Sequence, residues 1–447
     1  MNKRAISLLL VAVMAAATLA GCGGNSAPAA GGDAAAPAEG GEAAAPAGDA
    51  GHTLSVYAWD ASFNIPALQA AADDYKANVD PDFELVIHEA SGSSDVETAI
   101  TTAGAAGDYS TLDDIVLFQD HYIQRYVADY PDAWIPAEGA DINWADFGEE
   151  KLSYSTIDGQ HYGIPVDNGA AVCAYRIDLL EAAGYSIADL TGCTWDKFIE
   201  IGKAVYDATG KYLMCMDGDG NDLVYMMLQC EGSSQFKDGV PYMVENETFV
   251  KVIEIIEDML ANNCLYLANS WSDYTDQAIQ GDMVAGVFNG NWIIPTIEKV
   301  ADNSGKWEIT SAPTIAGGEG YAANGGSSLY ITSNCKNADL AKDFLAKTFG
   351  SSTATYDAAL KNGGVISCYA PAAQSEVYQE GVEFFNNQPI YSSIVEMGTH
   401  VQPIEQNDFH YSARRYVAAA IINIQNGADL MSELQNAEDQ LKFEMGL

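Results

Sequence analysis

The stretch Ile115-Val116-Leu117-Phe118 places four apolar side chains in succession and is followed at once by the polar pair Gln119-Asp120. An unbroken apolar run of this length is typical of a strand that is buried on both faces of a sheet. Working outward from it, the pattern predicts strands at 54–59 and 83–87 and helices at 65–79 and 96–106. Strands that alternate with helices build a mainly parallel sheet covered by helices, so the sequence predicts an α/β fold.

The rest of the folded chain contains more predicted helix, with Gly-rich breaks. Between 179 and about 300 the pattern predicts helices at 194–206, 248–260 and 293–300. Thr194 is the expected N-cap of the first of them. Strands are predicted at 284–288 and 329–331, and later helices at 338–349, 411–425 and 429–443. Asn426-Gly427 lies between the last two helices and is expected to cap the earlier one.

The chain begins with the layout of a secretory signal. Lys3 and Arg4 precede a short apolar run, 5–18, and small residues come just before Cys22. The run is too short for a membrane-spanning helix, which needs about 20 apolar residues. Leu19-Ala20-Gly21-Cys22 resembles the lipobox of bacterial lipoproteins. The resemblance implies a signal peptide at 1–21, a lipid anchor on Cys22 and a position on the extracellular face of the cell membrane. An ordinary secretory signal with an incidental cysteine is the alternative.

Residues 22–51 are expected to form a flexible linker. After Cys22 the segment is almost wholly Gly, Ala, Pro, Ser, Asp and Glu, without aromatic or large aliphatic residues. Such a segment cannot bury enough apolar surface to offset the entropy that ordering would cost. The folded part that follows, 52–447, is long for one domain and suits two.

The charge of the chain restricts its partners. With 20 basic and 63 acidic residues the formal net charge is −43. Phosphate contacts need a basic surface, so nucleic acid is excluded as a partner. Long-range attraction of an anionic substrate is disfavoured for the same reason, and a neutral or cationic ligand fits better.

Motifs for resident metals are weak or missing. Seven widely spaced cysteines follow Cys22, and none forms a C-x-x-C pair, so a zinc or thioredoxin-like site has no support. Most of these thiols are expected to be reduced and buried, and the sequence does not exclude one disulfide among them. The acidic turn 217–222 lacks the Gly at the sixth position of a calcium loop, and Leu228 stands where the bidentate Glu would be. His161 is interpreted as solvated or bonded to backbone. We therefore expect no cofactor and no metal.

Three segments, taken in order, resemble the extracellular solute-binding proteins of ABC importers, in particular the sugar-binding group that includes maltose-binding protein. The first is Gly159-Gln160-His161-Tyr162-Gly163-Ile164-Pro165 with Thr194-Trp195-Asp196-Lys197-Phe198 further on. The second runs from Ala278 to Met283 and on to Asn289-Gly290-Asn291-Trp292. The third runs from Ala312-Pro313 through Gly325–Leu329 to Ala338–Leu345. Asp282 and Val284 depart from the Lys and Ala that are usual in this family, and ligand identity carries over less well than fold.

The resemblance implies a two-lobed periplasmic-binding-protein-like fold of type II, in which a multi-strand hinge joins two mainly parallel sheets flanked by helices. The expected N-terminal lobe is 52–170 plus 325–350, and the C-terminal lobe is 171–324 plus 351–447. Crossings are expected near 170–172 and 324–326, with a third after Phe349. The implied role is to capture a carbohydrate, and specifically an oligosaccharide, and to deliver it to the permease of an ABC transporter. We expect a monomer without enzymatic activity.

A sugar site needs aromatic rings for the C–H faces and fixed polar groups for the hydroxyls. In such folds it lies at strand ends, in the crevice between the lobes. Trp292, preceded by Asn291, matches the family tryptophan that stacks on a sugar ring; a buried core tryptophan is the alternative. The other candidates follow predicted strands, lie at the predicted crossings or are aromatic residues of the C-terminal third: Trp59, Asp60, Gln119, Asp120, Asp167, Asn168, Gly325, Gly326, Tyr369 and Tyr411. The alternative for the polar pairs is that they cap a helix or lie in a solvated turn. For the two tyrosines, a position in the core is favoured over one in the site.

Two other functions stay open on the sequence alone. An extracellular glycoside hydrolase would also use aromatic rings and paired carboxylates. Against it, the chain has no G-x-S-x-G, H-E-x-x-H, P-loop or G-x-G-x-x-G motif. A binding protein for a cationic solute, such as a polyamine or a peptide, is the other alternative, because acidic and aromatic residues also hold cations.

Overall fold

The computed structural model describes residues 51–447 except 62, 219 and 221. The predicted signal peptide, the lipidated Cys22 and the linker up to residue 50 lie outside the described residues.

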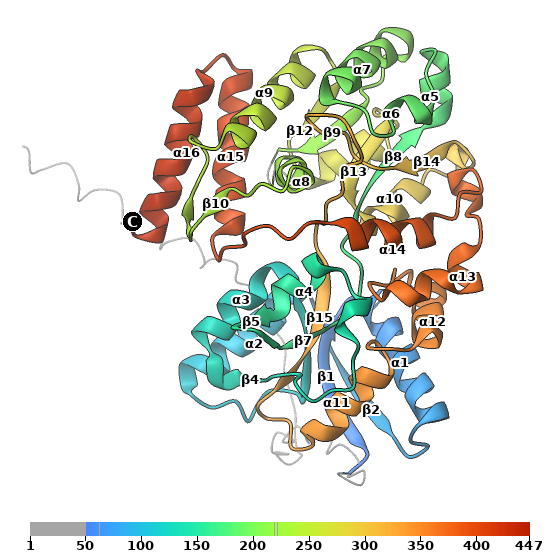
Figure 1. Cartoon of the computed structure of the whole chain (residues 1–447), viewed down its shortest axis with the longest axis vertical. Helices are drawn as coiled ribbons and strands as arrows, with labels where there is room; N and C mark the ends of the chain where they lie inside the picture. The colour runs from blue at the N-terminus through green and yellow to red at the C-terminus, as the bar shows by residue number, and fades with distance from the viewer. Residues whose placement is uncertain (1–50, 62, 219, 221) are drawn as a thin grey trace, which may run out of the picture. The chain divides into compact units, whose positions relative to one another are not determined.

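The first sheet has the order β2-β1-β3-β15-β4, and β7 also pairs with β15. Strand β1 (Thr53–Trp59) is parallel to β2 (Glu84–Ala90) and to β3 (Ile115–Gln119). Strand β15 (Ser327–Thr332) is antiparallel to β3, β4 (Trp134–Ile135) and β7 (Gly163–Pro165). Figure 1 shows β15, in orange, inside a sheet otherwise made by the blue and cyan strands of the early chain. We call this sheet and the helices on it the N-terminal lobe.

The second sheet is built around β8 (Ala171–Arg176), which is antiparallel to β13 (Gly286–Gly290) and to β14 (Trp307–Thr310). Strand β9 (Met214–Asp217) is parallel to β12 (Leu265–Ala268), and a parallel bridge from Tyr212 to Val284 links β9 to the β13 side. We call this sheet and its helices the C-terminal lobe. The predicted α/β class is confirmed, but the sheets are mixed, because β15 is antiparallel to its neighbours in the first sheet and β8 is antiparallel to both of its neighbours in the second.

The two reversed strands, β8 and β15, are the first strands that the chain forms after it passes from one sheet to the other. Ser327 at the start of β15 is opposite Gln119 at the end of β3, and Ala171 at the start of β8 is opposite Gly290 at the end of β13. The chain therefore enters each sheet at the edge where the other strands end. This edge collects the polar residues that follow the strands, as expected for a ligand site in an α/β fold.

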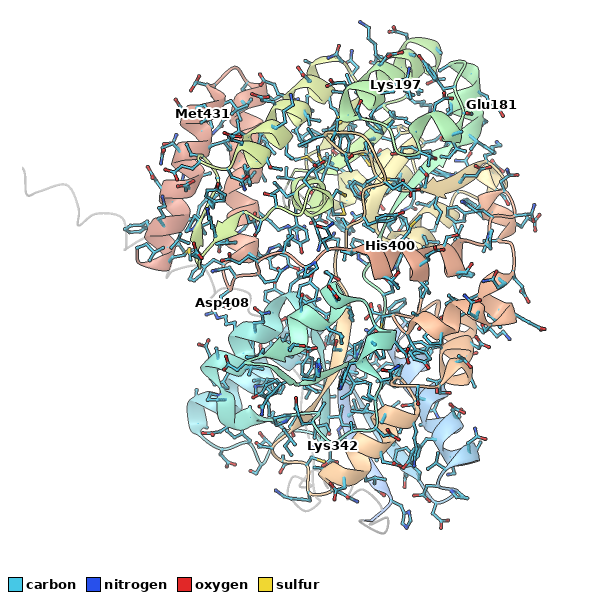
Figure 2. All side chains as sticks on the ribbon, viewed as in Figure 1. Glu181, Lys197, Lys342, His400, Asp408 and Met431 are labelled. Carbon is cyan, nitrogen blue, oxygen red and sulfur yellow. The ribbon has the colours of Figure 1, made fainter. Side chains whose placement is uncertain are left out.

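Capped amphipathic helices cover the sheets. Thr194 accepts a hydrogen bond from the Lys197 amide and caps α7, as predicted. The longer helices are α1 (Asn64–Asn78), α2 (Ser93–Ala106), α3 (Asp120–Asp129), α7 (Trp195–Thr209), α8 (Asp222–Cys230), α9 (Glu247–Ala261), α11 (Ala338–Lys347), α12 (Thr353–Gly363), α14 (Ile390–His400), α15 (His410–Gln425) and α16 (Leu430–Met445). Shorter ones are α4 (Glu149–Ser155), α5 (Ile177–Ala182), α6 (Ile187–Leu190), α10 (Ile294–Glu298) and α13 (Glu376–Gln379). Charged side chains such as Glu181 and Lys197 project outward from α5 and α7 (Figure 2).

The core is apolar and its thiols are unpaired. The seven described cysteines are free, and Cys173, Cys215, Cys264, Cys335 and Cys368 are buried. Among the described residues, none of the helices is both long enough and apolar enough to pass through a membrane.

The prediction of a mainly helical middle was incomplete. The structure adds β9 and β12 there, and α12, α13 and α14 after Phe349, which the sequence pattern did not predict. Both added strands have four residues and contain no β-branched residue, so they carry little strand signal. The lobe boundaries at 170, 324 and 350 stay a prediction.

Candidate ligand-binding site

A pocket of about 340 Å³ lies where the strands end and the chain crosses between the sheets. Residues from both lobes line it: Trp59, Asp60, Phe63, Asn64, Gln119, Asp167, Asp222, Trp292, Asn324, Gly325, Gly326, Ser327, Tyr411 and Arg414. A second cavity, of about 300 Å³, lies between α9 and α15, but mainly aliphatic side chains line it. Only the first of these two brings aromatic, carboxylate, amide and guanidinium groups together, so it is the candidate site.

The structure brings most of the sequence candidates to this pocket. Those that line it are Trp59, Asp60, Gln119, Asp167, Trp292, Gly325, Gly326 and Tyr411. Their role in ligand binding stays a prediction.

Four other candidates lie away from the lining, and each has a partner inside the protein. Asp120 pairs with Lys151 and accepts a hydrogen bond from Ser328. The Asn168 side chain accepts from the Ala170 amide (2.6 Å) and donates to the Ser367 carbonyl (3.1 Å).

Asn291 and Tyr369 are the remaining two. The Asn291 side chain donates to the backbone carbonyls of Asn168 and Ala170, so it fixes the crossing strand. The ring of Tyr369 is buried and stacks on Tyr356 at 6.1 Å.

Trp292 forms one wall of the pocket and is half-buried. Its indole Nε1 donates a hydrogen bond of 2.7 Å to the Asn324 carbonyl. The Asn324 side chain in turn donates to Asp222 (2.9 Å) and to Asn289 (2.8 Å). This chain of hydrogen bonds fixes the orientation of the indole at the pocket wall.

Arg414 supplies the positive charge of the pocket. Its guanidinium forms an ion pair with Asp222 and donates to the Gly220 carbonyl at 3.1 Å. It also lies 5.2 Å from the ring of Tyr411 and 5.3 Å from the ring of Tyr225. Burial lowers the pKa of Arg414 to about 10, so the side chain is a fixed cation at neutral pH.

Backbone conformation is specialised at both strand ends that meet the pocket. Asp60, directly after β1, has φ 71°, a left-handed conformation that non-glycine residues seldom adopt. Gly325 and Gly326 have φ 88° and 105°. A Cβ on Gly325 would lie 3.0 Å from Nε1 of Trp292, and one on Gly326 would lie 2.6 Å from Oδ2 of Asp120. Only glycine fits this crossing.

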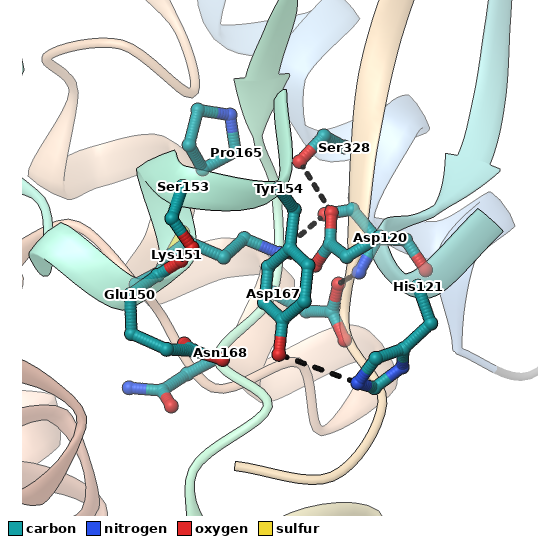
Figure 3. A network of polar contacts seen from close by, with 12 residues as sticks. Asp120, His121, Glu150, Lys151, Ser153, Tyr154, Pro165, Asp167, Asn168 and Ser328 are labelled. Carbon is teal, nitrogen blue, oxygen red and sulfur yellow. Dashed lines mark hydrogen bonds and ion pairs between the residues drawn. The ribbon is translucent and has the colours of Figure 1, made fainter. Parts of the chain in front are cut away.

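A buried cluster of charged and polar residues around Asp120 and Lys151, which we call the sealed cluster, is drawn in Figure 3. The Lys151 amine contacts the Asp120 carboxylate and donates to the Ser327 carbonyl at 2.9 Å. Burial would lower the pKa of Lys151, but the carboxylates of Asp120 and Asp167 outweigh it and raise the pKa above its ordinary range. Burial raises the pKa of Asp120 to about 6, although Lys151 opposes the shift. Asp167 borders both regions, because it lines the pocket and accepts from the Ser327 amide at 2.6 Å.

Aromatic residues join the lobes beside this cluster. His121 of α3 stacks on His410 of α15, with ring centroids 5.1 Å apart and an interplanar angle of 2°. The hydroxyls of Tyr154 and Tyr225 are 3.2 Å apart and both lie near Nε2 of His121. Burial lowers the pKa of His410 to about 3 and that of His121 well below its ordinary value. Both imidazoles are therefore neutral at pH 7.

Sequence reasoning missed Phe63, Asn64, Asp222, Asn324, Ser327 and Arg414. Asn324 and Ser327 flank the predicted Gly325-Gly326 crossing, and Phe63 and Asn64 follow Asp60 closely, so proximity to predicted residues was an available signal. Asp222 ends the acidic turn at 217–222. Arg414 carries no local signal, because α15 comes from the far end of the chain.

This arrangement can bind a ligand, and the described residues show no metal site. Tryptophan faces can stack on apolar ring faces, and carboxylate, amide and guanidinium groups can hydrogen-bond to hydroxyls. In the described part of the chain there is no group of three or more His, Cys, Asp or Glu that could hold a metal ion.

Comparisons with known proteins identify the family of the chain. The family described as "Bacterial extracellular solute-binding protein" matches residues 70–386. A lactose-binding protein of Rhizobium radiobacter is 30% identical over 390 residues, which cover 87% of this chain and 92% of the relative. An arabinooligosaccharide-binding protein of Bacillus subtilis (strain 168) is 26% identical and covers 48% of this chain and 53% of its own length.

Solved structures share the fold. A structure described as "Extracellular solute-binding protein family 1" gives a TM-score of 0.74 at 18% identity and covers 87% of this chain and 99% of its own. The sugar-binding protein MalE from the phytopathogen Xanthomonas citri gives 0.70 at 16% identity, with 87% and 96% covered. These likenesses confirm the predicted two-lobed α/β fold of type II. The chain belongs to the bacterial extracellular solute-binding protein family.

Proposed function

We propose that the protein captures a carbohydrate, specifically a short oligosaccharide, in the pocket between its lobes and delivers it to the permease of an ABC importer. The observation that carries the proposal is the pocket itself. Trp59 and Trp292 stand among carboxylates, amides and Arg414, which is the combination that ring faces and hydroxyls require. The relatives named above for lactose and arabinooligosaccharide support the same ligand class.

The size and charge of the pocket limit the classes of ligand that fit it. Its volume of about 340 Å³ is at the lower end of ligand pockets, which favours one or two sugar rings held inside. Asp60, Asp167 and Asp222 outnumber the single cation Arg414 among the lining residues. Acidic sugars are therefore disfavoured, and lactose, a neutral disaccharide, is the first ligand to test. The same excess of carboxylates keeps a cationic solute as the second candidate.

Closure of the lobes is the proposed capture step. Gln119 at the end of β3 and Trp292 after β13 come from different sheets and line one pocket. A ligand that touches both lobes favours the closed form by the free energy of the contacts made only in that form. The protein acts as a monomer, and no reaction on the ligand is required.

The proposed location is the outer face of the cell membrane, through a lipid on Cys22 after removal of residues 1–21. The membership of an extracellular family supports an exported protein. A diacyl anchor would add about 0.8 kcal/mol of membrane affinity per buried methylene. Substitution Cys22→Ser should release the protein to the medium or leave it unprocessed, and a variant that is still processed and membrane-bound would count against the lipid anchor.

Calorimetric titration of the purified protein tests the function. Lactose, arabinotriose, spermidine and a short cationic peptide are the probes, and each reaction mixture is also assayed for new reducing ends. We expect saturable binding of a saccharide, none of spermidine or peptide, and no new reducing ends. Binding of spermidine alone would show that the ligand is a cationic solute and not a carbohydrate. New reducing ends would identify a hydrolase.

A further inference from the structure

Trp271 stands out among the seven tryptophans because its side chain is 43% exposed. It does not line the pocket, yet its ring centroid is 5.7 Å from that of Trp292, which does. The two ring planes are inclined by 46°. An aromatic surface therefore continues from the pocket wall toward the solvent.

The ring of Trp271 is held in place from behind. It stacks on Tyr274 with centroids 5.2 Å apart and an interplanar angle of 20°. Tyr274 is buried, and its hydroxyl accepts a hydrogen bond from Asn289 at 3.1 Å. Asn289 also accepts from Asn324, whose carbonyl holds Trp292. One hydrogen-bonded network thus positions both tryptophans, Trp292 through the Asn324 carbonyl and Trp271 through its stack on Tyr274.

The backbone at Trp271 is fixed as well. The π-helix η3 (Asp273–Ile279) begins two residues later, and π-helical turns are frequent at functional sites. The Asp273 carboxylate accepts from the Asn269 amide at 2.8 Å and from the Tyr266 hydroxyl at 3.1 Å. Thr275 donates to the Trp271 carbonyl at 3.1 Å. An exposed aromatic ring on an anchored backbone loses little entropy when a ligand binds it.

We propose that Trp271 is a second stacking surface, which receives a sugar ring that projects out of the pocket and so makes the protein selective for longer oligosaccharides. The inference rests on the proposed carbohydrate function. The pocket holds the inner rings against Trp292, and the inclined face of Trp271 meets the next ring along the chain. Specificity of this kind comes from the difference in contacts that two ligands make.

Matched pairs of ligands that differ by one ring test the proposal. Lactose is compared with galactosyl-lactose, and arabinobiose with arabinotriose, by calorimetry on the unmodified protein, on Trp271→Ala and on Phe443→Ala. Phe443 is 86% exposed and is the control for loss of an exposed aromatic ring. Aromatic stacking predicts a loss of about 2- to 12-fold for the longer ligand with Trp271→Ala, and a smaller loss for the shorter one.

Shielding of the Trp271 ring from solvent by a bound ligand gives an independent readout. Quenching of tryptophan fluorescence by acrylamide should fall when the longer ligand is added to the unmodified protein and change less with the shorter one. Equal losses for both lengths, no loss for either, or failure of the unmodified protein to bind the longer ligand would overturn the role of Trp271 while carbohydrate binding stands. Absence of binding to all four sugars would instead overturn the proposed function, and the role of Trp271 with it.

Discussion

The two charged pairs beside the crossings differ in what surrounds them. Lys151 and Asp120 are 7% and 0% exposed, and protein groups surround both. Arg414 and Asp222 are 1% and 20% exposed, and both line the pocket. The first pair is almost wholly buried and lies outside the pocket lining, so we expect it to stabilise the fold. The second leaves a carboxylate on the pocket wall, where a hydroxyl group of a ligand can reach it.

The end of β3 shows the same division in neighbouring residues. Gln119 lines the pocket, and Asp120 lies in the sealed cluster. A single step along the chain thus separates a residue of the pocket lining from one inside the sealed cluster. Substitutions on the two sides should therefore affect different quantities, stability on one side and affinity on the other.

The largest effect is expected in the sealed cluster. Lys151→Met removes one partner of a buried ion pair and leaves the Asp120 carboxylate unpaired, which typically costs about 3–5 kcal/mol of unfolding free energy. The control is Lys197→Met on α7, where the pair with Glu200 is exposed (39% and 60%) and should contribute little, because solvent screens it. Denaturant titration of both variants checks this. Similar losses in the two variants would show that the cluster does not hold the crossing.

A pH-dependent effect is expected at Glu150, the neighbour of Lys151. Burial raises its pKa to about 7 from 4.5. Between pH 4.5 and 7 the unfolded chain loses this proton while the folded protein keeps it, so stability falls as the pH rises through this window and stays at the lower level above pH 7. The shift corresponds to about 3 kcal/mol. Glu150→Gln should thus be more stabilising, relative to the unmodified protein, at pH 8 than at pH 5, by an amount of that order.

Denaturant titration at the two pH values measures this difference. Glu149→Gln is the control, because Glu149 is the exposed neighbour on the same helix. We expect its effect to be the same at both pH values. If the effect of Glu150→Gln on unfolding free energy is the same at pH 5 and pH 8, burial does not raise the pKa of the Glu150 carboxyl.

The smallest effect is expected on the pocket side, at Gln119. Gln119→Ala removes one neutral hydrogen-bonding group, worth about 0.5–1.5 kcal/mol, so saccharide affinity should fall about 2- to 12-fold. Unfolding free energy should change by less than about 1 kcal/mol. Gln124→Ala is the control, because Gln124 is also half-buried but donates to the Ser153 carbonyl inside the protein. Calorimetry should show unchanged affinity in that variant, and a loss of stability without loss of affinity in Gln119→Ala would reverse the assignment.

The sequence was informative where a pattern is local. Apolar runs located β1, β2, β3 and β15. Residues at the ends of β1 and β3, such as Trp59, Asp60 and Gln119, reach the pocket because parallel strands end at one edge. Short strands such as β9 carry too few residues for a periodic signal.

The rest of the site depends on tertiary contacts. Asp120 and Asn168 follow strands just as their neighbours do, and only the packing of Lys151 and Ser367 against them shows that they face inward. Arg414 comes from a helix near the end of the chain, and nothing near it in sequence connects it with Trp292. Such pairings arise from the path of the chain between the lobes and not from local preference.

Trp292→Ala tests most directly whether the pocket is a saccharide site. The ring is half-buried and faces the pocket, so its removal should cost about 2–4 kcal/mol of binding, or roughly 30- to 1,000-fold in affinity. Unfolding free energy should fall by less than about 2 kcal/mol, near the low end for loss of a partly buried ring. Trp144→Ala is the matched control, because that ring is also half-buried but stacks on His161 at 4.0 Å, away from the pocket lining. Calorimetry with the best-binding saccharide and denaturant titration of both variants should show an affinity loss for Trp292→Ala alone. A stability loss of about 3–5 kcal/mol with intact affinity in the folded fraction would contradict the account.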